Sequence, residues 1–131
     1  MMIADTSFLI DIMKSDKEAI KKAEEIEKNG NTIAVTSISI FELFVGVTLS
    51  IKQDQERNKI NRILKGLPMI SFDEDSAIEA GKIFAQKRKN GAKIEPEDSM
   101  IAGICLRRNE ILITRNIKHF NDIEGLRIEN Y

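Results

Sequence analysis

The stretch MMIADTSFLIDI, residues 1–12, breaks an apolar run with Asp5, Thr6 and Ser7. MMIA has the length and composition of a short buried strand, and the following TSFLIDIMK those of a helix. Any of the three polar residues could begin that helix, because their side-chain oxygens accept hydrogen bonds from free amides of a first turn. The segment therefore predicts a strand followed directly by a helix. For the second acid, Asp11, we expect only solvent exposure or a local pair.

The rest of the chain repeats this alternation of short apolar runs and longer amphipathic segments. Strands that alternate with helices predict an α/β fold with a parallel sheet covered on both faces. Ligands of such sheets gather outside the carboxyl ends of the strands. The further strands are expected at 32–37, 68–72, 110–114 and 125–130, and the further helices at 16–30, 37–50, 53–67, 73–91 and 95–109.

Length and composition indicate one globular domain, residues 1–131, with 42% apolar and 31% charged residues. No apolar stretch approaches the roughly 20 residues of a membrane-spanning helix, and Asp5 interrupts any signal-peptide core, so we expect a cytoplasmic protein. The one cysteine, Cys105, excludes an internal disulfide and is expected in the core. The net charge of -1 does not identify a partner, because local charge clusters can cancel in the total.

Three acids occupy positions that call for explanation. Asp5 could simply cap its helix, and Asp98 could simply interact favourably with the dipole at the start of a helix that begins near Pro96. Asp98 nevertheless heads an apolar stripe three, four and seven residues further on, which directs it toward the packed side. Glu42 lies among apolar helical neighbours, where an unpaired charge is costly, so either a salt bridge, an open polar stripe or a functional role must explain it. The apolar neighbours of Glu42 are Ile38, Phe41, Val45 and Leu49.

Thr114, Arg115 and Asn116 follow the strand expected at 110–114, at the same edge of the sheet. Carboxylates that lie close together raise one another's pKa unless a cation lies among them. Oxygen ligands suit hard divalent ions, and Mg²⁺ typically combines a few carboxylates with waters and a phosphate. A chain with one cysteine and one histidine offers no spaced zinc ligands. The pattern therefore favours metal-assisted phosphodiester chemistry.

Four segments in this order resemble the PIN-domain family, and most closely its VapC toxin branch: ADTSFLID, SISIFEL, GAKIEPEDSMIAG and LITRNIKHF. Together with IEGLRIENY they spread over nearly the whole chain. The resemblance implies a three-layer α/β/α sandwich with a parallel sheet of four to five strands. It also implies a Mg²⁺- or Mn²⁺-dependent endoribonuclease, a homodimer, and inhibition by a small antitoxin.

Carried over residue by residue, the resemblance makes Asp5, Glu42 and Asp98 the metal-binding and catalytic acids. Many relatives have a fourth acid after the fourth strand, where this chain has Asn116, whose amide oxygen can still ligate a metal or orient a water. Thr6 matches a hydroxyl that would hold Asp5. His119 and Asp122 follow closely, but a structural histidine and a surface acid are the better interpretations.

Three further parts of the sequence are candidates for contacts with other molecules. Arg115 beside the expected metal edge is a candidate for phosphate contact, and the basic run KRKNGAK, residues 87–93, is a weaker one, because basic residues also complement a helix end. The segment Ile38 to Leu49 is more apolar than one buried face requires, and in the resembled family the antitoxin lies along that region.

We therefore expect a metal-dependent endoribonuclease toxin that cuts RNA by in-line attack of an activated water. Two alternatives stay open. The first is a housekeeping RNA-processing nuclease of the same family, and the second is a catalytically weak protein that binds a partner through the same fold. Neither the RNA that is cut nor the number of metal ions follows from the sequence.

Overall fold

A computed structural model describes residues 1–131 and confirms the predicted α/β fold. Five strands form a sheet in the order β3-β2-β1-β4-β5, and every neighbouring pair is parallel. The sheet thus has the larger of the two expected strand numbers. The strands are β1 (Met2–Ala4), β2 (Ile33–Thr36), β3 (Met69–Ile70), β4 (Ile111–Ile113) and β5 (Ile128–Glu129).

Each predicted helix is present, and one short helix, α7, was not predicted. The segment that forms α7 is only four residues long, too short to show a helical periodicity in the sequence. The helices are α1 (Thr6–Met13), α2 (Lys17–Lys28), α3 (Ser37–Leu49), α4 (Gln53–Leu64), α5 (Glu74–Lys89), α6 (Pro96–Arg108) and α7 (Ile117–Phe120).

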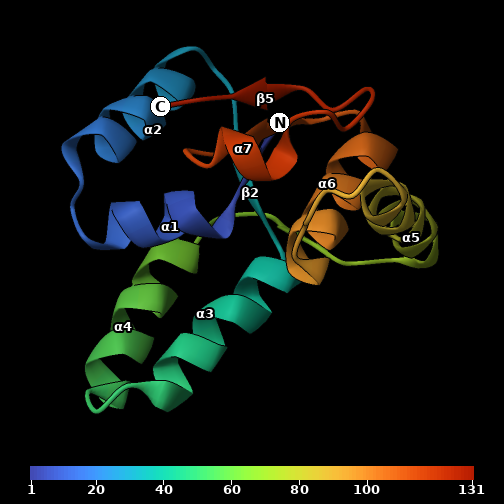
Figure 1. Ribbon diagram of the computed structural model, residues 1–131. Coiled ribbons are helices and arrows are strands. Elements are labelled where there is room, and N and C mark those ends of the chain that lie inside the picture. Colours follow the sequence, from blue (N-terminus) through green and yellow to red (C-terminus); the bar gives the residue numbers. More distant parts are fainter.

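The sheet separates two hydrophobic clusters, because successive strand residues point to opposite faces. Met2 and Ala4 of β1 belong to one cluster, with residues of α1 to α4, whereas Ile3 belongs to the other, with residues of α5, α6 and α7. Figure 1 shows α1 and α2 on one side of the sheet and α5 and α6 on the other. Cys105 lies in the second cluster and is buried, as predicted, and this burial raises the pKa of its thiol.

The two helices α5 and α6 approach each other closely because Gly103 has no side chain. A Cβ at this position would lie 2.7 Å from the backbone oxygen of Ser76 and 2.9 Å from the backbone nitrogen of Ala80. A Cβ atom does not approach other atoms this closely, so only glycine permits the observed packing. The close contact packs α6, whose first turn carries Asp98, tightly against α5.

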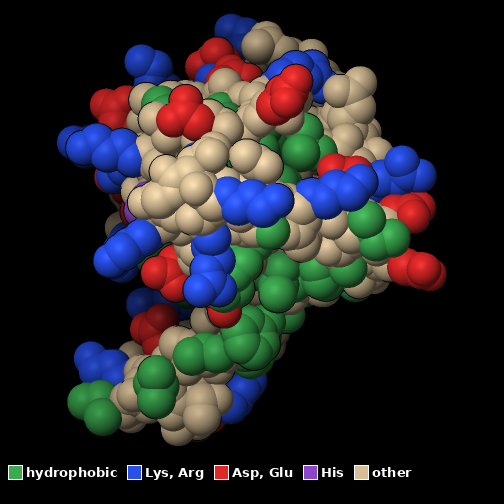
Figure 2. Space-filling view, turned by 45° about the vertical axis from the view of Figure 1, so that its right-hand side comes forward, with side chains coloured by type: hydrophobic (Ala, Val, Ile, Leu, Met, Phe, Trp, Pro, Cys, Tyr) green, Lys and Arg blue, Asp and Glu red, His purple; other side chains and the backbone are tan.

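The helices α3 and α4 extend away from the sheet as a helical hairpin (Figure 1). The face of α3 that packs inward carries Leu43 and Val47, whereas Phe41, Val45 and Leu49 are 59%, 43% and 80% exposed. Figure 2 shows hydrophobic side chains gathered along the exposed flank of this hairpin. The segment Ile38 to Leu49 is thus, as expected, more apolar than one buried face requires, because α3 has apolar residues on more than one face and buries only one of them.

The carboxyl ends of the three central strands meet at one edge of the sheet. Asp5 follows β1, Thr36 ends β2, and Thr114 follows β4. The backbone amide of Asp5 donates to the carbonyl of Ile113 at 2.9 Å, which aligns the ends of β1 and β4. This edge therefore holds the segments in which the sequence predicted a site. None of the helices is both long and apolar enough to cross a membrane.

Candidate active site

Asp5 lies at the point where β1 becomes α1, and its side chain is held from both sides. Oδ1 accepts a hydrogen bond from the backbone amide of Thr6 at 2.8 Å, so Asp5 is also the N-cap of α1. Oδ2 accepts from the hydroxyls of Ser7 at 2.9 Å and Thr114 at 2.8 Å. Burial raises the pKa of Asp5, and the three hydrogen bonds oppose this rise because they favour the charged form. The result is a buried carboxylate with a fixed orientation.

Glu42 reaches the same edge from the second turn of α3. Its Oε1 accepts a hydrogen bond from the hydroxyl of Thr6 at 2.7 Å, and that hydroxyl lies 2.9 Å from Oγ of the buried Ser39. Burial raises the pKa of Glu42, the Thr6 hydroxyl opposes this, and the charges of Asp5 and Glu97 add to it. Thr6 was expected to hold Asp5; its backbone does so, while its side chain holds Glu42.

Asp98 approaches from the first turn of α6, above the buried residues Ile101, Ala102 and Cys105, as its spacing predicted. Its Oδ2 lies 3.2 Å from Nδ1 of His119, which α7 presents. Burial and the charge of Asp5 raise the pKa of Asp98 to about 6, and Glu42 adds to the rise, whereas His119 opposes it. The structure therefore brings Asp5, Glu42 and Asp98 near enough for their charges to influence one another.

Asn116 lies on the turn that follows β4, next to the same edge. Its backbone amide donates to Oγ1 of Thr114 at 3.0 Å, and this hydroxyl in turn donates to Asp5. Asn116 is half-buried and precedes α7 as its N-cap residue. The guanidinium of Arg115 is directed toward Asp11 and Asp16. The turn thus joins Asp5 to α7 through backbone and hydroxyl groups.

The donor set fits a hard divalent cation in type and in number. As the side chains stand, no group of three acidic, histidine or cysteine residues is drawn together closely enough to form a metal site. A carboxylate has about four lone-pair positions, and Asp5 uses three, whereas Glu42 Oε2 and Asp98 Oδ1 accept from no protein donor. Three carboxylates with raised pKa values and unused oxygen lone pairs are typical of a site that a cation would stabilise.

Four residues contribute to the site although no role in it was predicted for them; of these, only Thr114 had been placed at the same edge of the sheet. Ser7 and Thr114 bond directly to Asp5, Ser39 contacts Thr6, and Glu97 adds to the negative charge near Glu42. Ser39 lies one helical turn before Glu42, and Thr114 follows β4 directly, so their positions alone could have indicated them. The spacing of the other two residues from the acids gave no comparable signal.

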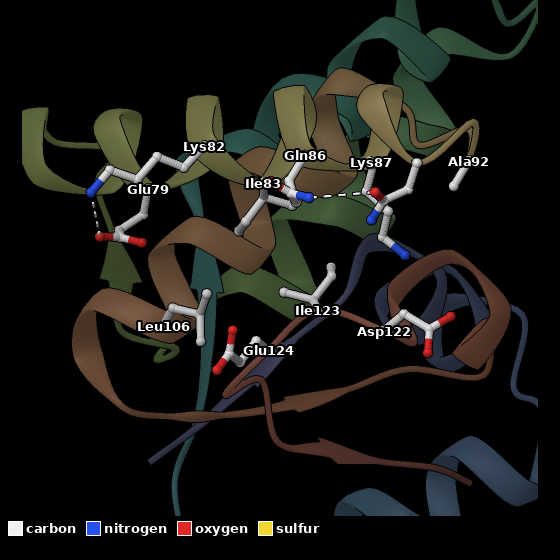
Figure 3. A pocket seen from close by; sticks show the side chains of 11 residues that line it. Glu79, Lys82, Ile83, Gln86, Lys87, Ala92, Leu106, Asp122, Ile123 and Glu124 are labelled. Atoms are coloured by element: carbon white, nitrogen blue, oxygen red, sulfur yellow. Dashed lines mark hydrogen bonds and ion pairs between the residues drawn. The ribbon is translucent and has the colours of Figure 1, made fainter.

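Two neighbouring acids behave differently from the site residues. Asp11 was expected to face solvent or to pair locally, and this is wrong: its Oδ2 accepts from the hydroxyl of Tyr131 at 2.6 Å and lies 3.5 Å from Arg115. Asp122 is exposed, in accordance with a surface role, and lines a pocket of about 890 Å³ between α5 and the segment 122–124 (Figure 3). None of the three site acids lines this large pocket. Its charged lining residues are of both signs and include Glu79, Lys82, Lys87 and Glu124.

Residues 2–126 match the sequence model of the PIN domain. This chain belongs to the PIN-domain family. The tRNA(fMet)-specific endonuclease VapC of Salmonella typhimurium is 29% identical over 97% of this chain and 95% of the relative. Ribonuclease VapC2 of Rickettsia felis is 30% identical over the same shares of the two chains. This PIN domain therefore matches VapC ribonucleases over almost its full described length.

Solved structures give the same result for the three-dimensional arrangement. A chain in the structure of VapBC2 from Rickettsia felis bound to a promoter DNA fragment superposes with a TM-score of 0.91 at 30% identity, and the match covers 99% of this PIN domain and 98% of that chain. A chain in the DNA-bound VapBC of Salmonella typhimurium gives a TM-score of 0.88 at 29% identity, with the same coverage. The three-layer α/β/α arrangement of the PIN fold is thus confirmed.

Proposed function

We propose that this PIN domain is a metal-dependent endoribonuclease that acts as the toxin of a toxin–antitoxin pair. The observation that carries the proposal is the convergence of Asp5, Glu42 and Asp98 at the carboxyl edge of the sheet, each with a raised pKa. A metal-dependent nuclease needs such an arrangement, because the cation that it holds near the phosphate offsets the negative charge that opposes attack. The VapC ribonucleases among its relatives support the same activity.

Asp5, Glu42 and Asp98 would hold Mg²⁺ or Mn²⁺, with the side chain of Asn116 near a bound water or a second ion. The bound ion supplies a water of lowered pKa and polarises the phosphoryl oxygen of the RNA. Mg²⁺ is the first candidate because it is bound by a few carboxylates and keeps several waters. Mn²⁺ suits the same oxygen donors.

The residues around the three acids keep them in a defined geometry. Both oxygens of Asp5 are oriented by hydrogen bonds, which Ser7, Thr114 and the Thr6 amide donate. The Thr6 hydroxyl donates to Glu42 and so holds this side chain beside Asp5. His119 contacts Asp98 and keeps the pKa of Asp98 lower than it would be without this contact. These contacts hold the carboxylates ready before an ion or an RNA arrives, which reduces the reorganisation that binding requires.

The surface of the helical hairpin is suited to a partner protein. A pocket of about 390 Å³ lies between α1, α3 and α4, and Glu42 lines it together with apolar residues such as Leu43 and Val47. The exposed apolar residues Phe41, Val45 and Leu49 lie on another face of the same helix. A small antitoxin that lies along Ile38 to Leu49 would cover apolar surface and approach a site acid at once, and we also expect a homodimer.

The proposed activity is tested by cleavage of labelled RNA in the presence of Mg²⁺ or Mn²⁺. Initiator tRNA is the first substrate to use, because the Salmonella relative is named for it. We expect wild-type protein to cut the RNA, EDTA to stop cleavage, and Asp98→Asn to abolish it. Asp122→Asn is the matched control, since this exposed acid lines a pocket that none of the three site acids lines, and its loss should leave the rate unchanged. Equal cleavage by wild type and Asp98→Asn would refute the assigned site.

The toxin role is tested separately from the chemistry. Expression of the wild-type chain should arrest growth, Asp98→Asn should not, and co-expression of a neighbouring small protein should restore growth. A housekeeping nuclease would cut RNA without this arrest. A partner-binding protein without catalysis would bind the neighbour and leave RNA intact with either metal.

A further inference from the structure

The exposed side chain of Arg115 has three partners, two near the start of the chain and one at residue 131. One of its guanidinium nitrogens lies 2.8 Å from Oδ2 of Asp16, the N-cap of α2, and the other lies 3.5 Å from Oδ2 of Asp11 in α1. The guanidinium carbon is 4.8 Å from the centre of the Tyr131 ring, the geometry of a cation–π contact. One side chain thus joins the turn after β4 to α1, to α2 and to the last residue of the described chain.

The partners of Arg115 are connected to one another. The Tyr131 hydroxyl donates to Asp11 at 2.6 Å, and the Tyr131 ring packs edge-on against the buried Phe8, with 4.8 Å between ring centres. Asp16 also accepts from the backbone amide of Ala19 at 3.0 Å, which holds its carboxylate in place. Because each partner has a second contact with the domain, Arg115 is bound to a framework of side chains that are themselves held in place.

Arg115 is also the residue between the two polar groups that bear on Asp5. Thr114 before it donates to Asp5, and Asn116 after it donates its amide to Thr114. The guanidinium faces two carboxylates, so its charge is already compensated. An arginine engaged in this way is poorly placed to bind RNA phosphates, but it is well placed to immobilise the turn on which Thr114 and Asn116 lie.

We infer that Arg115 is a positioning residue, which ties the turn 114–116 to the framework of Asp11, Asp16 and Tyr131 and thereby keeps Thr114 and Asn116 in place beside Asp5. This inference rests on the proposed function in one respect: Asp5 is taken as a metal ligand. The role differs from a phosphate contact, because neutral changes to Asp16 should reproduce the loss of Arg115.

The inference is tested with Arg115→Ala and Asp16→Asn. Asparagine can still cap α2 through its side-chain oxygen, so Asp16→Asn removes the ion pair and keeps the helix start. The matched control is Arg107→Ala, which removes another exposed arginine with one carboxylate partner, Asp75, at 3.1 Å. All three changes are at partly exposed side chains, so the variants should fold.

Amide hydrogen exchange of Asn116 reports the order of the turn directly and needs neither metal nor RNA. We expect Arg115→Ala and Asp16→Asn to accelerate it about tenfold or more, and Arg107→Ala to leave it unchanged. Calorimetry with Mn²⁺ should show affinity about tenfold weaker in the first two variants. In RNA cleavage their kcat should fall, while KM and the salt dependence of binding should stay those of wild type.

Unchanged Asn116 exchange in Arg115→Ala would overturn the inference, and so would a raised KM with a flatter salt dependence in that variant alone, since this is the signature of a lost phosphate contact. If the wild-type chain neither binds Mn²⁺ nor cuts RNA, the proposed function fails, but the exchange measurement still decides whether Arg115 orders the turn. The two failures are therefore distinguishable.

Discussion

Nδ1 of His119 lies 3.2 Å from Oδ2 of Asp98, so the one histidine of the chain contacts an acid of the site. Burial and the charge of Asp5 raise the pKa of Asp98 to about 6, and His119 partly offsets them. An acid with this pKa changes its charge in the range where enzymes commonly work. The stability of the metal-free protein and its affinity for cations should therefore both depend on pH.

Asp98→Asn should stabilise the metal-free protein at pH 7.5. The pKa of Asp98 is raised in the folded state from an ordinary value of 3.8, so folding favours the protonated form of this acid. The stability that the protonated acid provides is complete below about pH 4 and is lost as pH rises through about 6. The variant avoids this loss and should gain about 1 kcal/mol after solvent screening. Thermal unfolding in EDTA at pH 4 and pH 7.5 measures it, and an equal difference at both values would contradict it. Mg²⁺ should raise the melting temperature of wild type only.

His119→Gln should move the acidic limb of metal binding to higher pH. Glutamine can still donate a hydrogen bond to Asp98 but carries no charge, so an influence that lowers the pKa of Asp98 is lost and this pKa rises above about 6. When Mn²⁺ affinity is measured from pH 5 to 8, it should then reach its plateau at a higher pH than in wild type. The control Lys118→Gln removes a neighbouring charge on α7 and should leave the profile in place. A shift of the same size in the control would assign the effect to general surface charge.

The sequence was most informative where a residue's neighbours along the chain decide its environment. Asp5 follows a strand and precedes a helix, and Asp98 heads a stripe that is buried, so both could be placed at the sheet edge from spacing alone. Glu42 was placed there correctly for a partly wrong reason. Its apolar neighbours Phe41 and Val45 are exposed, and Glu42 reaches the site because it lies one turn after the buried Ser39.

The framework around Arg115 could not be predicted, for a physical reason. Asp11 and Tyr131 are 120 residues apart and meet only because β5 lies beside β4 in the sheet. Their side chains have no periodicity that would distinguish them from ordinary surface groups. Long-range polar contacts of this kind depend on strand order, and the order β3-β2-β1-β4-β5 does not follow from the separate elements.

Thr6→Val should weaken metal binding while the fold is retained. Valine has the shape of threonine, but without the hydroxyl the Oε1 of Glu42 loses its donor and the pKa of Glu42 should rise. We expect a loss of stability of about 1 kcal/mol and a rate about tenfold lower. Thr6→Ser keeps the hydroxyl and should retain most of the activity. Cleavage rates of the two variants provide the comparison, and equal losses in both would show that the methyl group, not the hydrogen bond, matters.

Gly103→Ala should destabilise the protein by about 1–3 kcal/mol, because the added methyl group would lie too near the backbone of Ser76 and Ala80 and force α5 and α6 apart. Gly81→Ala is the matched control within α5: a Cβ there has no atom within 4 Å, and alanine favours the helix by about 1 kcal/mol. Urea unfolding measures both free energies. A stable Gly103→Ala protein would mean that the helices can separate without cost.

Neutralising the basic end of α5 tests whether RNA passes beside Asp98 on this side. Arg88, Lys89 and Lys93 are exposed and form no ion pair. If they contact phosphates, changing all three to Gln should weaken RNA binding and reduce the slope of log K against log salt by about 2. The control changes three exposed lysines of α2 to Gln, at Lys17, Lys21 and Lys28, and removes the same charge elsewhere. Equal slopes in the two triple variants would show that RNA is attracted by the overall charge, because the effect would then not depend on which three charges are lost. The basic run would in that case have no specific contact with RNA and only its role at the helix end.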